Sequence, residues 1–171
     1  MMIINRTDFR ASTPSDWHKV RAVHDRAFGS EVESRLALTL LEDNQTASLD
    51  LLAELDGMVI GHVILSAAEE GPDRALVLGP LAVDPEWRDF QIGTELVRRV
   101  LADARLAGWK SVFALGEPDY YGRFGFKRSF TEHVTCAYNA GPSFQGLELE
   151  TGALAGFSGK LVYPAAFQDT D

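Results

Sequence analysis

Short apolar runs separated by polar turns predict the strands of a sheet. Residues 49–55 and 58–67 form two such runs, joined by Asp56-Gly57, a dipeptide that favours the positive φ angles of a type I′ turn. We therefore expect an antiparallel hairpin. A third run begins at Ala75 and is interrupted by Gly79-Pro80. Because proline donates no ladder hydrogen bond, this interruption predicts a bulge or a splayed edge, unless it only bends a barrel-like sheet.

Positions with a helical period flank these runs and predict three helices. Thr13 is a good N-cap with a proline at the next position, and Asp16 is placed to return the capping hydrogen bond. Glycines follow the first and third helical patterns, where they favour termination. The predicted helices cover residues 13–29, 30–43 and 91–108. Together with the apolar runs they indicate an α/β protein.

Shorter apolar stretches supply the rest of the sheet. Further strands are predicted at residues 2–7, 111–115, 131–138 and 146–149. A helix crosses between the run from Ala75 and the strand at 111–115, so these two strands should be parallel. At 171 residues with 46% hydrophobic positions, the chain suits a single domain, residues 1–171, with a sizeable core.

The charge balance and the single cysteine narrow the class of protein. Sixteen basic and 25 acidic residues give a net charge of −9, without the basic cluster that nucleic-acid binding requires. Cys136 is the only cysteine, so no intramolecular disulfide forms, and its place in a predicted strand makes it a poor nucleophile. With no leader pattern and no apolar run of membrane-spanning length, we expect a cytoplasmic protein without membrane contact.

The four histidines show no metal-ligand spacing, so we expect no metal site. His18 and His24 lie six residues apart and fall on different faces of a helix. His62 lies inside a predicted strand, where a packed, hydrogen-bonded imidazole is favoured over a catalytic one.

The strand that begins at Ala75 passes through a short turn into the third helix. Such a turn directs unpaired backbone N–H groups and the positive end of a helix dipole at one point, which favours a phosphate or pyrophosphate. Gly93 allows close approach to the backbone, and Arg88 adds a charge that can grip phosphate. The same pattern also occurs in α/β proteins that bind no cofactor, so on its own it is a weak signal.

Residues 83–96, Val-Asp-Pro-Glu-Trp-Arg-Asp-Phe-Gln-Ile-Gly-Thr-Glu-Leu, resemble the acetyl-coenzyme A signature of the GNAT superfamily of N-acetyltransferases. That signature has Arg or Gln, two variable residues, Gly, one variable residue, then Gly or Ala. Arg88 and Gly93 occupy its first and last positions, whereas Gln91 stands where the family usually has glycine. The resemblance implies that backbone groups of Leu81 and Val83 hold pantetheine and the acyl carbonyl. It implies a pyrophosphate site at Arg88, Asp89, Gln91, Gly93 and Thr94.

Residues 116–126 resemble a second GNAT landmark, in which a tyrosine lies five residues before the phenylalanine of a Gly-Phe pair. Tyr121 occupies that place. When an amine attacks the thioester, the departing thiolate needs a proton, which a neutral phenol can supply, so Tyr121 is the general-acid candidate. The alternative is that Tyr121 only joins Tyr120, Phe124 and Phe126 in an aromatic cluster that closes the core.

The sequence identifies no equally good general base. Glu117 could act directly or through water, or the base is water itself. Phe28, Glu31 and Glu33 lie between two predicted helices, where a loop could shape the acceptor pocket and bind an amine. The alternative for both glutamates is that they only offset the dipole of the helix that they begin.

These observations converge on a GNAT-type α/β domain with a mixed, partly splayed central sheet and helices on both faces. The tail at residues 152–167 resembles that of a bacterial branch of predicted acetyltransferases, which extends the resemblance over nearly the whole chain. We expect transfer of an acetyl group from acetyl-CoA to a primary amine of a small molecule or protein; a homodimer is compatible with this. The alternatives are a non-catalytic acyl-CoA sensor or partner-binding module, and a nucleotide-binding protein of another fold. The last is weakened because neither a P-loop nor Gly-x-Gly-x-x-Gly is present.

Overall fold

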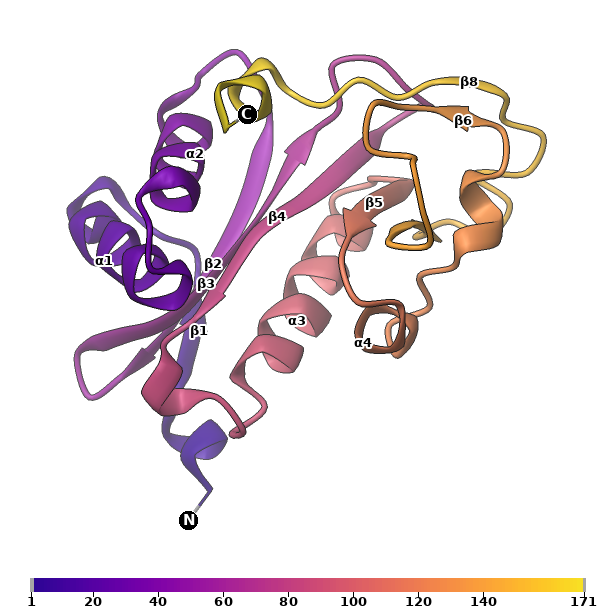
Figure 1. Cartoon of the computed structure of the whole chain (residues 1–171). Helices are drawn as coiled ribbons and strands as arrows, with labels where there is room; N and C mark the ends of the chain where they lie inside the picture. Colours follow the sequence, from indigo (N-terminus) through magenta and orange to yellow (C-terminus); the bar gives the residue numbers. More distant parts are fainter. Residues whose placement is uncertain (1, 171) are drawn as a thin grey trace.

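The apolar runs form one six-stranded mixed sheet in the order β1-β2-β3-β4-β5-β7 (Figure 1). The computed structural model describes residues 2–170. Only the β4–β5 pair is parallel, and the other neighbours are antiparallel. A separate two-stranded parallel pair joins β6 (Val134–Thr135) to β8 (Gly159–Lys160). The strands of the main sheet are β1 (Asp8–Arg10), β2 (Ser48–Leu55), β3 (Met58–Ala67), β4 (Ala75–Val83), β5 (Ser111–Leu115) and β7 (Phe144–Glu148).

Helices cover both faces of this sheet, as the sequence predicts (Figure 1). Adjacent β3 residues point to opposite faces, so Ile64 packs in one core with Leu40, while Leu65 packs in another with Val97. The helices are α1 (Trp17–Phe28) and α2 (Val32–Glu42) on one face, α3 (Ile92–Leu106) on the other, and the short α4 (Pro118–Gly122) after β5. No helix in residues 2–170 is both long enough and apolar enough to cross a bilayer.

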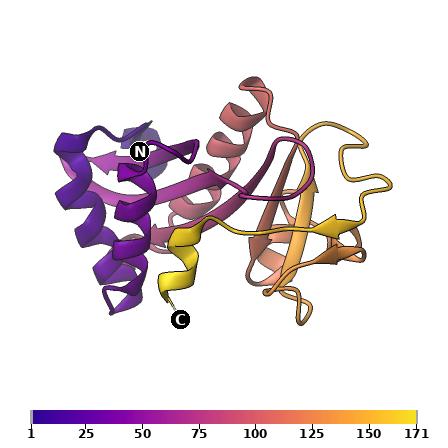
Figure 2. The ribbon, with the colours of Figure 1, turned by 90° about the horizontal axis from the view of Figure 1, so that it is seen from above.

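Short 3₁₀ helices link the main elements. They cover Ile3–Arg6, Pro14–Asp16, Pro85–Trp87, Arg128–Thr131 and Ala165–Thr170. The last follows a segment that returns from β8 across the molecule to lie beside α2 (Figure 2).

Several local predictions are confirmed at atomic detail. Asp56 and Gly57 have φ angles of 48° and 82°, the two positive values that a type I′ hairpin requires. The Thr13 backbone N–H donates to Asp16 Oδ2 at 2.8 Å, and Gly29 ends α1 with a φ of 66°. Turn and cap residues therefore set the ends of these elements where the sequence places them.

The interruption at Gly79-Pro80 produces the predicted bulge and splay. Val63 pairs with Leu81 but Leu65 pairs with Leu78, so β4 carries one more residue than β3 across this step. The β4–β5 ladder begins at Ala75 and ends at Val77 opposite Phe113. Beyond that point the two strands have no mutual pairing. The sheet is therefore split along the second half of β4.

Three strand predictions are wrong in extent or position. Residues 2–7 contain a 3₁₀ turn, closed by the Thr7 hydroxyl donating to the Ile3 carbonyl, and the strand begins only at Asp8. Residues 131–138 pair only over β6, because a 3₁₀ helix ends at Thr131 before it and the Asn139 N–H closes a turn onto the Cys136 carbonyl after it. The strand predicted at 146–149 begins two residues earlier and ends one residue earlier, as β7.

Candidate active site

The unpaired half of β4 presents its backbone to the open side of the sheet. The Asp84 N–H donates to the Ile60 carbonyl of β3 at 2.8 Å, and Ala82 is in register with His62 of β3. Because backbone groups alternate along a strand, those of Leu81 and Val83 point away from β3, into the split. The two residues expected to hold pantetheine therefore lie on the free edge.

The uncapped N-terminus of α3 lies next to this edge. Gln91 is the N-cap with a φ of 66°, and its side chain makes no capping hydrogen bond. The N–H groups of Ile92, Gly93 and Thr94 precede the first intrahelical bond, which Glu95 donates to the Gln91 carbonyl at 3.0 Å. They open onto a pocket of about 340 Å³. Its lining comprises Val83, Trp87, Arg88, Asp89, Gln91, Ile92, Gly93, Thr94, Tyr120 and Arg123.

Gly93 fits this pocket because it lacks a side chain. A Cβ there would lie 3.1 Å from Tyr120 Oη and 3.2 Å from Val83 Cγ2. Arg123 completes the same wall, with Nη1 3.3 Å from Thr94 Oγ1 and its guanidinium 4.6 Å from the centre of the Tyr120 ring. Tyr120 and Arg123 were not predicted from the sequence as pocket residues. The sequence feature that could have identified them is the Tyr-Tyr-x-Arg-Phe-Gly-Phe segment, in which both lie close to the general-acid candidate Tyr121.

Arg88 and Asp89, two charged residues of the pocket, have different contacts. The Arg88 guanidinium lines the pocket and donates from Nη2 to the Ala27 carbonyl at 2.9 Å, which ties the turn to the end of α1. Asp89 has a φ of 73°, and its carboxylate is unfavourable beside an anion. Any contact of Asp89 with pyrophosphate is therefore expected through its backbone.

Tyr121 is 8% exposed and packs edge-on against Tyr120 and Phe126. Burial, with a smaller contribution from Tyr120, raises the pKa of Tyr121 to about 12, so its hydroxyl keeps its proton at neutral pH. Gly116 leaves room for the ring, because a Cβ at that position would overlap it. The aromatic cluster foreseen as an alternative is thus present, and it holds a phenol that remains a proton donor.

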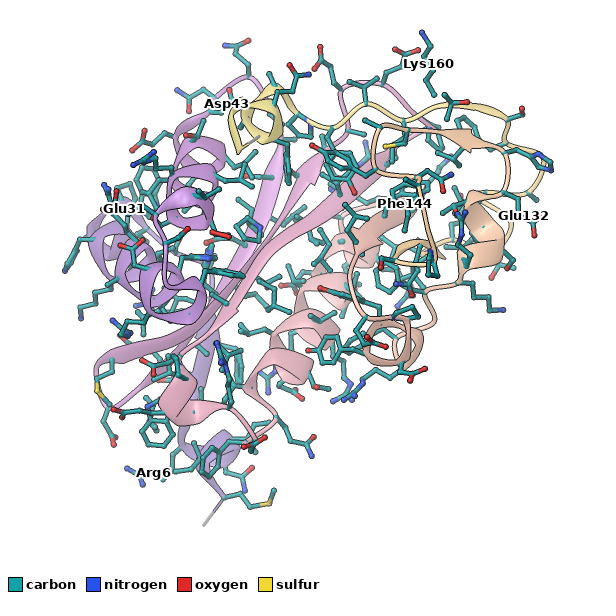
Figure 3. All side chains as sticks on the ribbon, in the orientation of Figure 1. Arg6, Glu31, Asp43, Glu132, Phe144 and Lys160 are labelled. Carbon is teal, nitrogen blue, oxygen red and sulfur yellow. The ribbon has the colours of Figure 1, made fainter. Side chains whose placement is uncertain are left out.

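The other predicted acidic residues are less enclosed. Glu117 is exposed at the N-cap of α4, where its carbonyl accepts from the Tyr121 N–H at 3.0 Å. Glu31 accepts from Arg35 Nη2 at 2.9 Å, and Glu33 accepts from the Ser30 hydroxyl at 3.3 Å. Figure 3 shows Glu31 at the outer edge of the helical layer. Both glutamates therefore lie at the start of α2, Glu31 as its N-cap and Glu33 in its first turn.

Phe28 is 42% exposed at the end of α1, where it stacks on His24. His62 is fully buried and hydrogen-bonded at both ring nitrogens, to His24 and to Asp50, as a packed imidazole should be. Within residues 2–170, no three His, Cys, Asp or Glu side chains gather closely enough to hold a metal ion.

A split parallel strand pair beside an uncapped helix N-terminus defines a fold of the acyl-coenzyme A N-acyltransferase type. In agreement, residues 17–126 match the family model described as "Acetyltransferase (GNAT) family". The chain belongs to this family.

Its relatives extend the likeness over almost the whole chain. It is 36% identical to the uncharacterized N-acetyltransferase YjhQ of Escherichia coli over 131 residues, 74% of this chain and 72% of YjhQ. It is 34% identical to the uncharacterized N-acetyltransferase YhbS of the same organism over 162 residues, 92% of this chain and 96% of YhbS.

Two solved structures resemble the fold. The Escherichia coli YhbS structure in complex with CoA has a TM-score of 0.87 and 32% identity, covering 95% of this chain and 92% of that one. A GNAT acetyltransferase from Brucella melitensis in complex with acetyl-CoA has a TM-score of 0.77 and 30% identity, covering 94% and 97%.

Proposed function

We propose that this protein transfers the acetyl group of acetyl-CoA to a primary amine by direct attack, with both substrates bound together. The observation that carries the proposal is the split between β4 and β5 beyond Val77, which leads to the uncapped N-terminus of α3. The CoA and acetyl-CoA complexes of the two similar structures support the choice of donor.

The residues of the split and the pocket fit an acyl-CoA chemically. The free backbone groups of Leu81 and Val83 would pair with the pantetheine amides as an added strand. The amides at the start of α3 and the Arg123 guanidinium would neutralise the pyrophosphate. Tyr121 would donate its proton to the sulfur as the C–S bond breaks. The acceptor is either a small molecule or a protein amine.

The first test is calorimetric titration with acetyl-CoA and, in parallel, with acetyl-pantetheine, which lacks the nucleotide and pyrophosphate. We expect acetyl-CoA to bind much more tightly. Arg123→Gln should weaken acetyl-CoA by about tenfold, because a charged contact to phosphate is lost, without changing acetyl-pantetheine. Arg98→Gln is the matched control, since Arg98 lies on α3 and pairs with Glu95 outside the pocket. Equal binding of both ligands would contradict the assigned pyrophosphate site.

The second test measures thiol release from acetyl-CoA with a panel of primary amines: an alanine-terminated peptide, a lysine peptide, spermidine, tyramine and glucosamine. Release that depends on one amine class supports the transferase and identifies the acceptor type. Binding of acetyl-CoA with no amine-dependent release would instead favour a sensor.

A further inference from the structure

Strand β5 loses its partner β4 just before it reaches the segment that carries Tyr121. The last β4–β5 pair joins Val77 to Phe113, so in the described part of the chain the rest of β5 is paired with β7 alone. Directly after β5, the Gly116 N–H donates to the Ser143 carbonyl at 3.0 Å. The split that an acyl chain would occupy therefore leaves the start of the Tyr121 segment supported by one strand.

Gln145 of β7 adds a side-chain bond at this point. Gln145 is 2% exposed, and its Nε2 donates to the carbonyls of Gly116 and Ser143, at 3.2 Å each. Both carbonyl oxygens can only accept, so the orientation of the amide is fixed. Gln145 is in register with Ala114, which packs in the same core as Tyr121, and residues directly opposite each other share one face of a sheet. The Gln145 amide therefore fixes the Gly116 turn on the Tyr121 side of the sheet.

The Gly116 turn is the surface against which the Tyr121 ring packs. A Cβ at Gly116 would lie 2.4 Å from Tyr121 Cε2 and 3.1 Å from its Cδ2, so the ring lies directly on the glycine backbone. The Tyr121 N–H also donates to the carbonyl of Glu117, the residue next to Gly116, at 3.0 Å. A displacement of Gly116 would therefore move the ring or open a gap beside it.

Strand β7 also holds the far end of the same segment. Lys127 and Gly146 exchange two backbone hydrogen bonds, of 2.8 and 3.1 Å. The two ends of residues 116–127 are thus fixed on neighbouring residues of one strand. Gln145 contributes the side-chain bond to the first of these ends, where the Tyr121 ring is in contact.

We propose that Gln145 is a positioning residue for the general acid: its amide holds the Gly116 turn against the Tyr121 ring and so fixes the phenol for proton transfer to sulfur. This inference rests on the proposed acetyl transfer. In that reaction the amine nitrogen bonds to the acetyl carbon and loses a proton to water, the C–S bond breaks, and the sulfur takes the Tyr121 proton. Water then returns a proton to Tyr121. Proton transfer needs donor and acceptor within hydrogen-bond reach, so a ring that is free to shift transfers its proton more slowly.

The contact is tested without an acceptor by NMR of the full chain with ¹³C-labelled tyrosine rings. Gln145→Met keeps the length of the side chain but removes both N–H donors. We expect the Tyr121 ring signals, assigned with Tyr121→Phe, to shift and broaden in this variant. Unchanged Tyr121 signals would overturn the proposal.

Thr131→Val is the matched control for the NMR and the kinetics. The Thr131 hydroxyl is also buried beside β7, where it donates to the Phe144 carbonyl at 3.4 Å, but it makes no hydrogen bond to Gly116. This variant should leave the Tyr121 signals and kcat as in the wild-type protein. The same changes in Thr131→Val as in Gln145→Met would overturn the specific role of Gln145.

The kinetic test uses acetyl-CoA and the panel amine with the highest turnover. Gln145→Met should lower kcat about tenfold and change the KM for acetyl-CoA by less than about twofold, because it leaves the pocket at the start of α3 intact. In a Tyr121→Phe background the same substitution should cause no further loss, since the group that it positions is absent. A purely structural role would lower the rate by the same factor in both backgrounds.

Gly116→Ala tests the same contact from the other side. The φ of Gly116 lies outside the left-handed region, so the added methyl group acts through its overlap with the Tyr121 ring. This variant should also lower kcat only where Tyr121 is present, and it decides should Gln145→Met not fold. Equal losses with and without Tyr121, or no loss in Gln145→Met, would overturn the positioning role and leave acetyl transfer standing. If wild-type protein binds acetyl-CoA but releases thiol with no amine, the proposed function falls and the role of Gln145 falls with it.

Discussion

Gln91 is held in a backbone conformation that suits glycine, so Gln91→Gly should stabilise the protein. Its φ of 66° is left-handed, which costs a residue with a Cβ about 1–2 kcal/mol. Glycine also makes the unfolded chain more flexible, which offsets about 0.4–1 kcal/mol of the stability gained by relieving this strain. The expected net gain is about 0.5–1 kcal/mol, which corresponds to a rise in Tm of roughly 1–4 °C for a chain of this size.

The measurement is urea unfolding and thermal unfolding of Gln91→Gly beside Gln91→Ala. Alanine removes the same side-chain atoms but keeps the Cβ, so it should give no comparable gain. We also expect Gln91→Gly to bind acetyl-CoA at least as tightly as the wild-type protein. Loss of the side chain gives the ligand more room in the pocket, while the α3 amides stay in place. If alanine stabilised the protein as much as glycine, or if glycine destabilised it, the attribution to backbone strain would be refuted.

Three further predictions concern proton transfer, cofactor affinity and folding. Tyr121→Phe should lower amine-dependent thiol release by about 100-fold with acetyl-CoA affinity unchanged, because the buried proton donor is lost; an unchanged rate would exclude it as the acid. Tyr120→Phe should instead alter affinity, since it removes the hydroxyl that faces Gly93 in the pocket. The Arg10 guanidinium, 2.8 and 3.0 Å from the Asp16 carboxylate oxygens, holds the pKa of Asp16 well below its usual 3.8. Because this folded-state pKa is depressed, its stabilisation is present above about pH 4 and is lost as the pH falls below it. Asp16→Asn should flatten that part of the stability profile in urea unfolding between about pH 6 and pH 3, and an unchanged slope would count against the assigned partner.

The elements that could be predicted from sequence are those with local physical causes. The hairpin turn at Asp56-Gly57 and the cap at Thr13 depend on φ preferences and hydrogen bonds within a few residues. The bulge at Gly79-Pro80 follows from a missing donor. The limits of β6 depend instead on the 3₁₀ helix that precedes it and on the turn closed by the Asn139 N–H, which the apolar pattern of residues 131–138 did not predict.

The candidate site also contains residues that a local motif predicts and residues that only the tertiary packing brings together. A motif of contiguous residues predicted the turn around Gly93. Arg123 instead reaches the pocket from the end of α4, where it contacts Thr94, a residue 29 positions away in the sequence. The hydrogen bonds of His62 to His24 and to Asp50 likewise join three separate elements. Each of these residues has an ordinary setting in the sequence, and only the packing of α1 on the sheet brings them together.

Arg88 connects the pocket at the start of α3 to the end of α1. The sequence predicts it as a phosphate ligand, and in the structure its Nη2 holds the Ala27 carbonyl at the end of α1. A guanidinium has five N–H donors, so one bond to α1 leaves others available to the pocket that Arg88 lines. A pyrophosphate bound there would thus share a side chain with the end of α1. The position of the C-terminal end of α1 is thereby linked to the presence of the acyl donor.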